Sequence, residues 1–292
     1  MKVMLAEYSV CTGMGAGIRK DVADIRVEGA AMLHSLKKSF ERADCSVSIP
    51  RDFGDDFSNV AKACDCGLVI APDDILADCT ARLESACINL GSTPAAIRLC
   101  ADKLETTELL LHNGLPTPRI VREGTTKCVV KPRTGCGSEG VFVSEGPVER
   151  DGFISTEYID GEHLSVSLIS GSGFVLPLTL NRQHIHMNGA VTYDGNDVNI
   201  DHPAQDEIFS VARKAGIMLG CKGLFGVDIV YADRPYIVDV NPRPTTAMVG
   251  VARVIDRNLA DLVLMARFGE LPDRVGYRGR CSFTKKDLGA FL

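Results

Sequence analysis

The sequence predicts a mixed fold, in which an α/β domain at the N-terminus precedes a second part built of α+β lobes. Over residues 1–90, short apolar runs alternate with segments of helical periodicity, which is the pattern of parallel strands joined by helices. Beyond residue 117, strand-like runs follow one another with turns between them, as in antiparallel sheets. At 292 residues and 45% hydrophobic composition, the chain is long enough for two domains with a substantial core.

Residues 1–90 are predicted to form a small Rossmann-like parallel sheet with flanking helices. Apolar residues are nearly continuous at 2–7 and 66–71, as in strands that are buried on both faces. Leu33, Leu36 and Phe40 recur at helical spacing. In chain order, the predicted elements are a strand at 2–7, a helix at 25–43, a strand at 46–49, a helix at 57–64, a strand at 66–71 and a helix at 78–86.

Residues 91–270 are predicted to form a second domain, with an antiparallel lid lobe at about 117–157. A Thr-Pro start signal and a glycine stop signal predict one helix at 93–113. We expect residues 271–292 to form a polar tail of uncertain order. The remaining predicted elements are strands at 119–121, 128–131, 140–143 and 153–157, a hairpin of 164–169 with 174–178, helices at 204–219 and 258–268, and a hairpin at 226–241.

Oxygen-bearing side chains gather on the last predicted hairpin. Asp228 lies in its first strand, and Asp239 and Asn241 lie two residues apart in its second strand, so strand alternation places the latter two on one face. Carboxylate and amide oxygens are the ligands that Mg²⁺ and Mn²⁺ accept, usually together with nucleotide phosphates. Arg243 follows directly and is suited to holding a phosphate. The hairpin therefore predicts a metal–nucleotide site.

A glycine-rich loop follows Lys131. Gly135, Gly137 and Gly140 form a G-x-G-x-x-G pattern that includes Ser138. A dinucleotide-binding fold needs a helix directly after such a loop, but the residues that follow have a strand pattern. The loop is therefore predicted to join two antiparallel strands and to close over ATP phosphates with its backbone N–H groups, with Lys131 supplying charge. The alternative is an ordinary surface hairpin.

Three further features are candidates for nucleotide binding. The segment 157–162 lies between the lid lobe and the next sheet, and clefts between lobes are common ligand sites. Its alternative is a charged β-turn. Lys103 lies early in the predicted helix before the lobe, and Arg182 is a candidate to hold a transferring phosphate. Each of these two side chains has an exposed surface position as its alternative.

Composition and charge exclude several classes of protein. The net charge of −6 argues against duplex nucleic acid as the main partner. No apolar stretch approaches the length of a membrane span, and no long apolar segment precedes Glu7, so we expect a cytoplasmic protein. The eleven cysteines form no C-x-x-C motif and are expected to be reduced thiols. The pattern leaves open whether the chain forms a homo-oligomer.

Taken in order, these features resemble the ATP-grasp superfamily over about residues 90–270. The resemblance implies that a nucleotide lies between two α+β lobes after an α/β domain, which residues 1–90 would supply. It also implies an enzyme that activates a carboxylate with ATP and then transfers the acyl group to an amine or thiol. The matching features are Lys103, Lys131, the glycine loop, the segment 157–162 and the hairpin carrying Asp228, Asp239, Asn241 and Arg243.

The resemblance also implies roles for particular residues. Glu157 and Ile159 would lie near the adenine and Glu162 near the ribose, while Lys103 and Lys131 would contact the phosphates. The implied ATP-binding residues are Lys103, Lys131, Gly135, Gly137, Ser138, Gly140, Glu157, Tyr158, Ile159 and Glu162.

For the metal, the resemblance implies Asp228, Asp239 and Asn241 as ligands. Arg182 or Arg243 would stabilise the transferring phosphoryl group, and Arg243 would also hold the acyl intermediate. Asp239 stands where the family commonly has glutamate, and the shorter side chain makes bidentate metal binding less certain.

Within the superfamily, shorter motifs resemble the archaeal tyramine–glutamate ligases of methanofuran biosynthesis. They lie at 7–8, 28–33, 100–103 and 282–285. This resemblance implies a cytoplasmic archaeal enzyme that uses ATP, tyramine and L-glutamate, and joins the amine to the side-chain carboxylate.

Other interpretations of the sequence stay open. The first is an ATP-grasp ligase for another amino acid and amine. The second is a non-catalytic nucleotide-binding protein, and the third is an oxidoreductase that uses the glycine motif. Glu7, Arg26 and Glu28 are candidates for recognising an amino acid or amine, or are ordinary surface charges.

Overall fold

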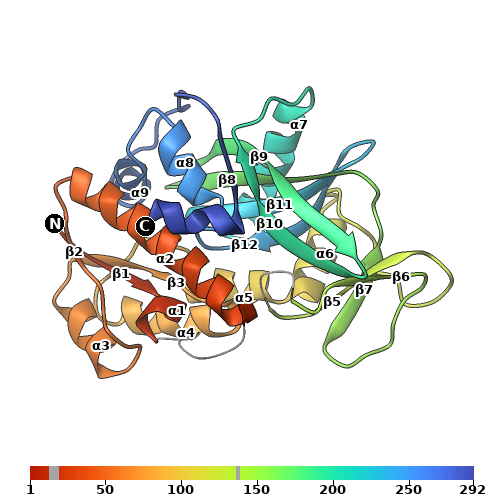
Figure 1. Cartoon of the computed structure of the whole chain (residues 1–292), viewed down its shortest axis with the longest axis horizontal. Coiled ribbons are helices and arrows are strands. Elements are labelled where there is room, and N and C mark those ends of the chain that lie inside the picture. Colours follow the sequence, from red (N-terminus) through yellow and green to blue (C-terminus); the bar gives the residue numbers. More distant parts are fainter. Residues whose placement is uncertain (13–19, 136–138) are drawn as a thin grey trace.

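The computed structural model describes residues 1–12, 20–135 and 139–292, and these residues form two sheets (Figure 1). A four-stranded sheet has the strand order β2-β1-β3-β4, and a nine-stranded sheet has the order β12-β11-β8-β9-β10-β6-β5-β7, with β13 paired to β10. The mixed α and β class expected from the sequence is confirmed. No helix in the described residues is long and apolar enough to cross a membrane.

The first sheet is parallel throughout and belongs to the N-terminal part of the chain. Leu33, Leu36 and Phe40 of the long second helix pack on one side of it, and Phe57 and Leu76 pack in a separate core on the other side. Its elements are β1 Lys2–Glu7, α1 Tyr8–Cys11, α2 Lys20–Arg42, β2 Ser46–Ser48, α3 Asp55–Lys62, β3 Cys66–Ile70, α4 Asp73–Glu84 and β4 Ile88–Asn89.

The single helix predicted at 93–113 is wrong, because two helices occupy this segment. α5 spans Pro94–Ala101 and α6 spans Lys103–His112. Asp102 between them is extended, with φ −86° and ψ 96°, and its carboxylate accepts hydrogen bonds from the backbone N–H groups of Leu104 and Glu105 in the first turn of α6. An aspartate that caps a new helix competes with continuing the old one. The break places Lys103 at the very start of α6.

The lid lobe is antiparallel, as expected. β5 (Cys128–Pro132) lies between β6 (Phe142–Ser144) and β7 (Phe153–Glu157). The strand predicted at 119–121 is reduced to one bridge, between Ile120 and Thr156. The glycine loop joins β5 to β6. In the described residues, the pairing of Ala190 with Phe142 and the hydrogen bond from Val191 N–H to the carbonyl oxygen of Val141 connect the lobe to β10.

The glycine loop is described only in part. Gly135 and Gly140 have φ values of +131° and +71°, a backbone region that favours glycine. Cys136, Gly137 and Ser138 lie outside the described residues.

The main part of the large sheet is also antiparallel, and α7 (Gln205–Met218) covers one of its faces. Leu164, Val166, Val227 and Ile229 point to this face and pack in a core with α7. The strands are β8 Glu162–Ser170, β9 Val175–Asn188, β10 Ala190–Val198, β11 Gly223–Tyr231 and β12 Pro235–Asn241. α9 (Leu259–Phe268) agrees with expectation, whereas α8 (Met248–Val254) was not anticipated.

The polar tail of uncertain order predicted at 271–292 is instead part of the folded structure. β13 (Cys281–Thr284) pairs with β10, and the 3₁₀ helix η1 (Lys285–Phe291) lies beside α2 (Figure 1). Phe283 and Leu288 are 1% and 0% exposed. Two buried apolar side chains therefore anchor a segment that is otherwise polar.

Candidate active site

Two carboxylates face one another on neighbouring strands of the large sheet. Asp228 of β11 is directly opposite Asp239 of β12, and residues directly opposite in an antiparallel pair share a face. Asn241 lies two residues beyond Asp239, and its Nδ2 atom donates a hydrogen bond of 3.2 Å to Oδ2 of Asp228. The structure thus brings together the three side chains expected to bind a metal.

The two carboxylates form an electrostatically unfavourable pair. Burial, and secondly the neighbouring charge of Asp239, raise the pKa of Asp228 to about 7, against the hydrogen bonds from Asn241 and Gln183. A divalent cation would relieve this repulsion. In the described residues, no three His, Cys, Asp or Glu side chains converge on a metal-sized point. Two carboxylates and an amide oxygen fit a hard cation whose other ligands are phosphates and water.

The pKa of Asp228 predicts a pH-dependent stability. Its folded-state pKa is raised above the ordinary value of 3.8, so the folded protein binds more protons than the unfolded chain between about pH 4 and pH 7. Stability of the metal-free protein should therefore fall as pH rises through this window and level off above it. Relative to Asp228→Asn, the loss between pH 5 and pH 8 should be on the order of 3 kcal/mol, at about 1.4 kcal/mol per pKa unit.

Urea unfolding of both proteins at pH 5 and pH 8 in a chelator measures this difference. Identical pH dependence in the wild type and Asp228→Asn would contradict the assigned repulsion.

Gln183 is a further member of the site that the sequence analysis missed. Its Nε2 atom donates a hydrogen bond of 3.0 Å to Oδ1 of Asp228. Gln183 alternates with Asn181 on β9, and Asn181 donates to the hydroxyl groups of Ser165 and Ser167 on β8. These polar side chains line the face opposite α7. The alternation of these polar residues with apolar ones is visible in the sequence. To assign Gln183 to the site from it, however, one must know that β9 lies two strands from β11.

Lys103 and Lys131 bring positive charge to the same region. Each is 8% exposed. Nζ of Lys131 donates to the carbonyl oxygen of Val238, next to Asp239, at 2.7 Å, and Nζ of Lys103 donates to the carbonyl oxygen of Gly135 at 2.5 Å. Burial lowers the pKa of Lys131, the charge of Asp239 opposes this shift, and the charge of Lys103 adds to it. Two buried lysines near two carboxylates suit a polyphosphate bound with a metal.

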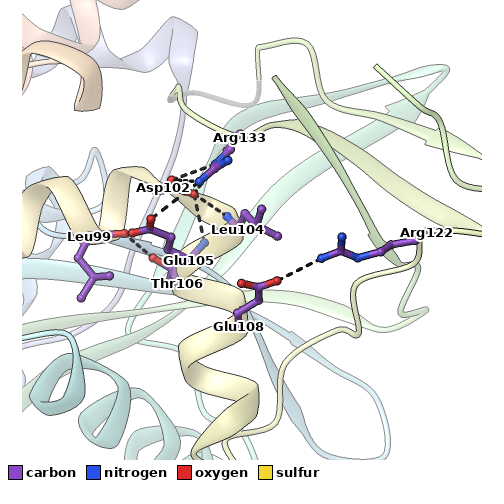
Figure 2. A network of polar contacts seen from close by, with 8 residues as sticks. All are labelled: Leu99, Asp102, Leu104, Glu105, Thr106, Glu108, Arg122 and Arg133. Atoms are coloured by element: carbon purple, nitrogen blue, oxygen red, sulfur yellow. Dashed lines mark hydrogen bonds and ion pairs between the residues drawn. The ribbon is translucent and has the colours of Figure 1, made fainter. Parts of the chain in front are cut away.

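A bidentate ion pair between Asp102 and Arg133 (Figure 2) lies directly beside Lys103 and fixes its position. The guanidinium of Arg133, just beyond β5, contacts both carboxylate oxygens of Asp102 at 2.6–2.9 Å. The backbone N–H of Lys103 also donates to the carbonyl oxygen of Arg133 at 2.9 Å. The start of α6 is thereby fastened to the strand that carries Lys131, so the two lysines are held together.

Asp102→Ala should weaken both the fold and phosphate binding. Loss of the helix cap should cost about 1 kcal/mol of unfolding free energy, and the displaced Lys103 should raise the KM for ATP. Glu108→Ala is the matched control, because Glu108 lies on the same helix and forms an exposed ion pair with Arg122 in the loop beyond it (Figure 2). Urea unfolding and ATP kinetics test both variants, and indistinguishable effects would refute the positioning role.

Arg243 links the acidic site, which consists of Asp228, Asp239 and Asn241, to the N-terminal domain. Its Nε atom contacts Oδ1 of Asp73, at the start of α4, at 3.1 Å, and the two side chains are 13% and 6% exposed. Its charge also lowers the pKa of Asp228, as a weaker influence than burial and the other neighbours. Arg243 therefore lies within electrostatic range of the carboxylates, as expected, and Asp73 orients it.

Comparison with known proteins places this arrangement in a family. A model of the ATP-grasp domain matches residues 100–247, and a model of the pre ATP-grasp 3 domain matches residues 30–97. The chain belongs to the ATP-grasp family. Tyramine–L-glutamate ligases of Methanocaldococcus fervens and Methanocaldococcus jannaschii are 32% and 34% identical to it. Both alignments span 90% of this chain, with 92% and 88% of the respective relatives.

Solved structures agree with this assignment. A putative ATP-grasp superfamily protein from Archaeoglobus fulgidus superimposes with a TM-score of 0.78 at 31% identity, over 94% of this chain and 90% of the other. An L-amino acid ligase from Bacillus licheniformis shares the fold with a TM-score of 0.67 at 15% identity, over 91% and 73%. The family and its named relatives make this chain an ATP-grasp ligase that binds ATP, depends on a divalent metal and forms carbon–nitrogen bonds.

Two residues expected in the nucleotide site of this ATP-grasp ligase lie on the opposite face of the sheet. Arg182 is opposite Leu164, whose side chain packs with α7, and its guanidinium contacts Glu162 at 2.9 Å. Glu162 is also 3.8 Å from His202, which packs against Tyr231. Strand alternation turns Arg182 and Glu162 away from Asp228, so their expected placement is corrected.

His163, and not Glu162, faces the side of the sheet that carries Asp228. It is opposite Val230, two residues along both strands from the pair of Ser165 with Asp228, so it shares the face of Asp228. Burial lowers the pKa of His163, which favours a neutral imidazole able to donate one hydrogen bond and accept another. The first residue of β8 that faces the acidic site is therefore a histidine.

Arg182→Met should retain most of the ligase activity. An exposed ion pair contributes about 0–1 kcal/mol, so ADP formation should stay within about fivefold of the wild type. If ADP formation fell more than a hundredfold while ATP binding stayed intact, Arg182 would have to act in the catalytic site. Glu162→Gln serves as the matched variant, because it removes the other partner of the same ion pair.

The segment expected near the adenine connects β7 to β8. Both oxygens of Glu157 accept hydrogen bonds from Arg119, at 3.0 and 3.1 Å. The ring of Tyr158 lies 4.4 Å from the ammonium of Lys127. Ile159 is partly exposed. The segment thus lies between the lobes as expected, with the Glu157 carboxylate already engaged by an arginine.

A surface groove of about 870 Å³ lies elsewhere on the molecule. Its walls come from the end of α4, the edge strand β4 and the turn between β8 and β9, and they include Glu84, Ile88 and Lys222. It contains none of the residues of the acidic site. We assign the chemistry to the face of Asp228 and Asp239, because the convergent charges lie there and not in this groove.

Proposed function

We propose that this ATP-grasp ligase joins tyramine to the side-chain carboxylate of L-glutamate, with Mg²⁺ as the preferred metal and Mn²⁺ as a substitute. The observation that carries the ATP-dependent part is the convergence of Asp228, Asp239, Lys103 and Lys131 on one region. The substrate pair is supported by two relatives named tyramine–L-glutamate ligase that align over 90% of this chain.

In this proposal, Asp228, Asp239 and Asn241 hold the metal, which would polarise the γ-phosphoryl group of ATP and disperse its developing charge. Lys103 and Lys131 bind the phosphates through charge-assisted hydrogen bonds. Gln183 supports the acidic site by holding Asp228 in its orientation. The backbone of the glycine loop, including Gly135 and Gly140, closes over the phosphates and limits the access of water. We propose that Gly137 and Ser138 belong to the same loop contact.

The proposed reaction has two displacement steps. A carboxylate oxygen of glutamate attacks the γ-phosphorus, the bond to the bridging oxygen breaks, and ADP leaves with an acyl phosphate formed. The neutral amine of tyramine then attacks the acyl carbon, loses a proton, and displaces inorganic phosphate to give the amide. Arg243, held by Asp73, lies where it can contact the phosphoryl group in both steps. Positioning and electrostatics supply most of the acceleration in such reactions.

We also propose domain limits of 1–90, 91–270 and 271–292, with the lid lobe at about 117–157. The family matches at 30–97 and 100–247 change over between residues 97 and 100, a few residues beyond the proposed first boundary. A cytoplasmic role in archaeal methanofuran biosynthesis is the corresponding proposal for the pathway.

Product analysis tests the proposed function directly. Protein, ATP, Mg²⁺, tyramine and L-glutamate are incubated together, and the mixture is analysed by mass spectrometry for the amide, ADP and phosphate. We expect one ADP and one phosphate for each amide, with the bond at the side-chain carboxylate. An amide that forms only with another amine or amino acid would redirect the substrate assignment. ATP binding with no ADP formed in any mixture would favour a non-catalytic nucleotide-binding protein.

A further inference from the structure

A charged pair lies where the N-terminal domain meets the face of the large sheet that carries the acids. Nζ of Lys285, at the start of η1, contacts Oε1 of Glu28 on α2 at 2.6 Å. The other oxygen, Oε2 of Glu28, accepts a hydrogen bond of 2.8 Å from the hydroxyl of Thr246. Thr246 follows β12, the strand of Asp239. The pair therefore joins the N-terminal domain, the C-terminal segment and the segment that follows β12.

Tyr193 of β10 connects this pair to the carboxylates. Burial raises the pKa of Tyr193 well above its ordinary value, and the charges of Glu28 and Asp228 raise it further. The phenol therefore stays neutral, and its oxygen accepts a hydrogen bond of 2.6 Å from Nδ2 of Asn196. Nζ of Lys285 lies 5.6 Å from the centre of its ring. One phenol thus lies within electrostatic range of both Glu28 and Asp228.

The two charged side chains are only partly shielded from solvent. The side chain of Glu28 is 15% exposed and that of Lys285 is 26% exposed. Each charge also has unused hydrogen-bonding capacity, since an ammonium carries three donors and a carboxylate about four acceptor sites. A ligand that offers the opposite charge to each group would therefore bind the pair without leaving either charge unpaired.

We infer that Glu28 and Lys285 bind the α-ammonium and α-carboxylate of the amino-acid substrate, an inference that rests on the proposed function. A zwitterion placed here meets the opposite charge at each end, with Glu28 accepting from the ammonium and Lys285 donating to the carboxylate. Its side chain is then free to extend past Tyr193 toward Asp228 and the phosphoryl group. The arrangement explains why the side-chain carboxylate, and not the α-carboxylate, is activated.

Two analogues of glutamate, each lacking one charged group, distinguish a substrate-binding role of Glu28 and Lys285 from a purely structural role. Glutarate lacks the α-ammonium, and 4-aminobutyrate lacks the α-carboxylate, yet each keeps the carboxylate that reacts. The wild type should prefer L-glutamate to both by kcat/KM. Glu28→Gln should reduce the preference for L-glutamate over glutarate about tenfold or more. Lys285→Met should likewise reduce the preference for L-glutamate over 4-aminobutyrate. Losses of this size are expected when hydrogen bonds to charged groups are removed.

The control is Lys286→Met, because Lys286 is the exposed neighbour of Lys285 on η1. The KM for ATP should be unchanged in all three variants, and Lys285→Arg should restore part of the selectivity. If Lys285→Met lowers activity equally with glutamate and 4-aminobutyrate, or changes neither, the pair merely fastens η1 to α2 and the inference is wrong. If the wild type forms no glutamyl amide at all, the proposed function fails, and this inference fails with it.

Discussion

Asp239→Asn is expected to lower ADP formation by about 10²–10³-fold, the magnitude typical for the loss of one group that stabilises transition-state charge. Asp239 and Asp228 are the two carboxylates that face each other here, so removal of Asp239 halves the negative charge that this pair offers to a cation. The amide has nearly the same shape, and the strand pairing should persist. Coupled-enzyme detection of ADP at saturating ATP and Mg²⁺ measures the loss, and circular dichroism checks the fold.

Asp233→Asn is the matched control for this variant. Asp233 lies in the turn between β11 and β12 and is exposed, so it shares the hairpin without sharing the site. Its activity should equal that of the wild type. Normal ADP formation by a folded Asp239→Asn protein would show that the carboxylate pair is not the metal site.

Lys131→Met should lower kcat/KM for ATP by about 10–100-fold. Its ammonium lies near Asp239 and is held against the carbonyl of Val238, where it can donate to a phosphate that shares the metal. The loss of a hydrogen bond to a charged group accounts for the expected size. Stability without nucleotide should change little, because burial already lowers the pKa of Lys131 and disfavours its charged form.

Lys214→Met is the control for charge alone, since Lys214 lies on the exposed side of α7. Steady-state kinetics with ATP varied, together with thermal unfolding, compares the two variants. Equal kcat/KM for ATP in the wild type and Lys131→Met would remove Lys131 from the nucleotide site.

The parts of the site that the sequence predicts well are those fixed by local pairing. Asp228 and Asp239 lie within one hairpin, so a short turn is sufficient to bring them face to face. The placement of Lys131 is equally predictable, because it stands at the entrance of a loop between paired strands. These inferences need no knowledge of the rest of the chain.

The errors arise where the outcome depends on a neighbouring element. Arg182 is one residue from Gln183, and only the packing of β9 against α7 determines which of them faces the acids. A shift of one residue along a strand reverses the face of a side chain. At Asp102, a helix cap reinforced by Arg133 overrides the continuous helical pattern.

The C-terminal segment illustrates another limit of sequence patterns. Phe283 and Leu288 are too few to produce a recognisable periodicity, yet both are almost fully buried. Gly195 of β10 allows this packing, because a Cβ atom there would lie 2.0 Å from the carbonyl oxygen of Phe283. Such a contact between distant segments leaves no local signal in the sequence.

Metal binding measured in the presence of nucleotide tests the central claim most directly. Mn²⁺ is titrated into the protein with ADP, and electron paramagnetic resonance reports the free ion. Wild type and Asp233→Asn should bind Mn²⁺ with the same affinity, whereas Asp228→Asn and Asp239→Asn should each weaken binding by at least tenfold. Unchanged Mn²⁺ affinity in both of the latter variants would contradict a metal–nucleotide site between Asp228 and Asp239.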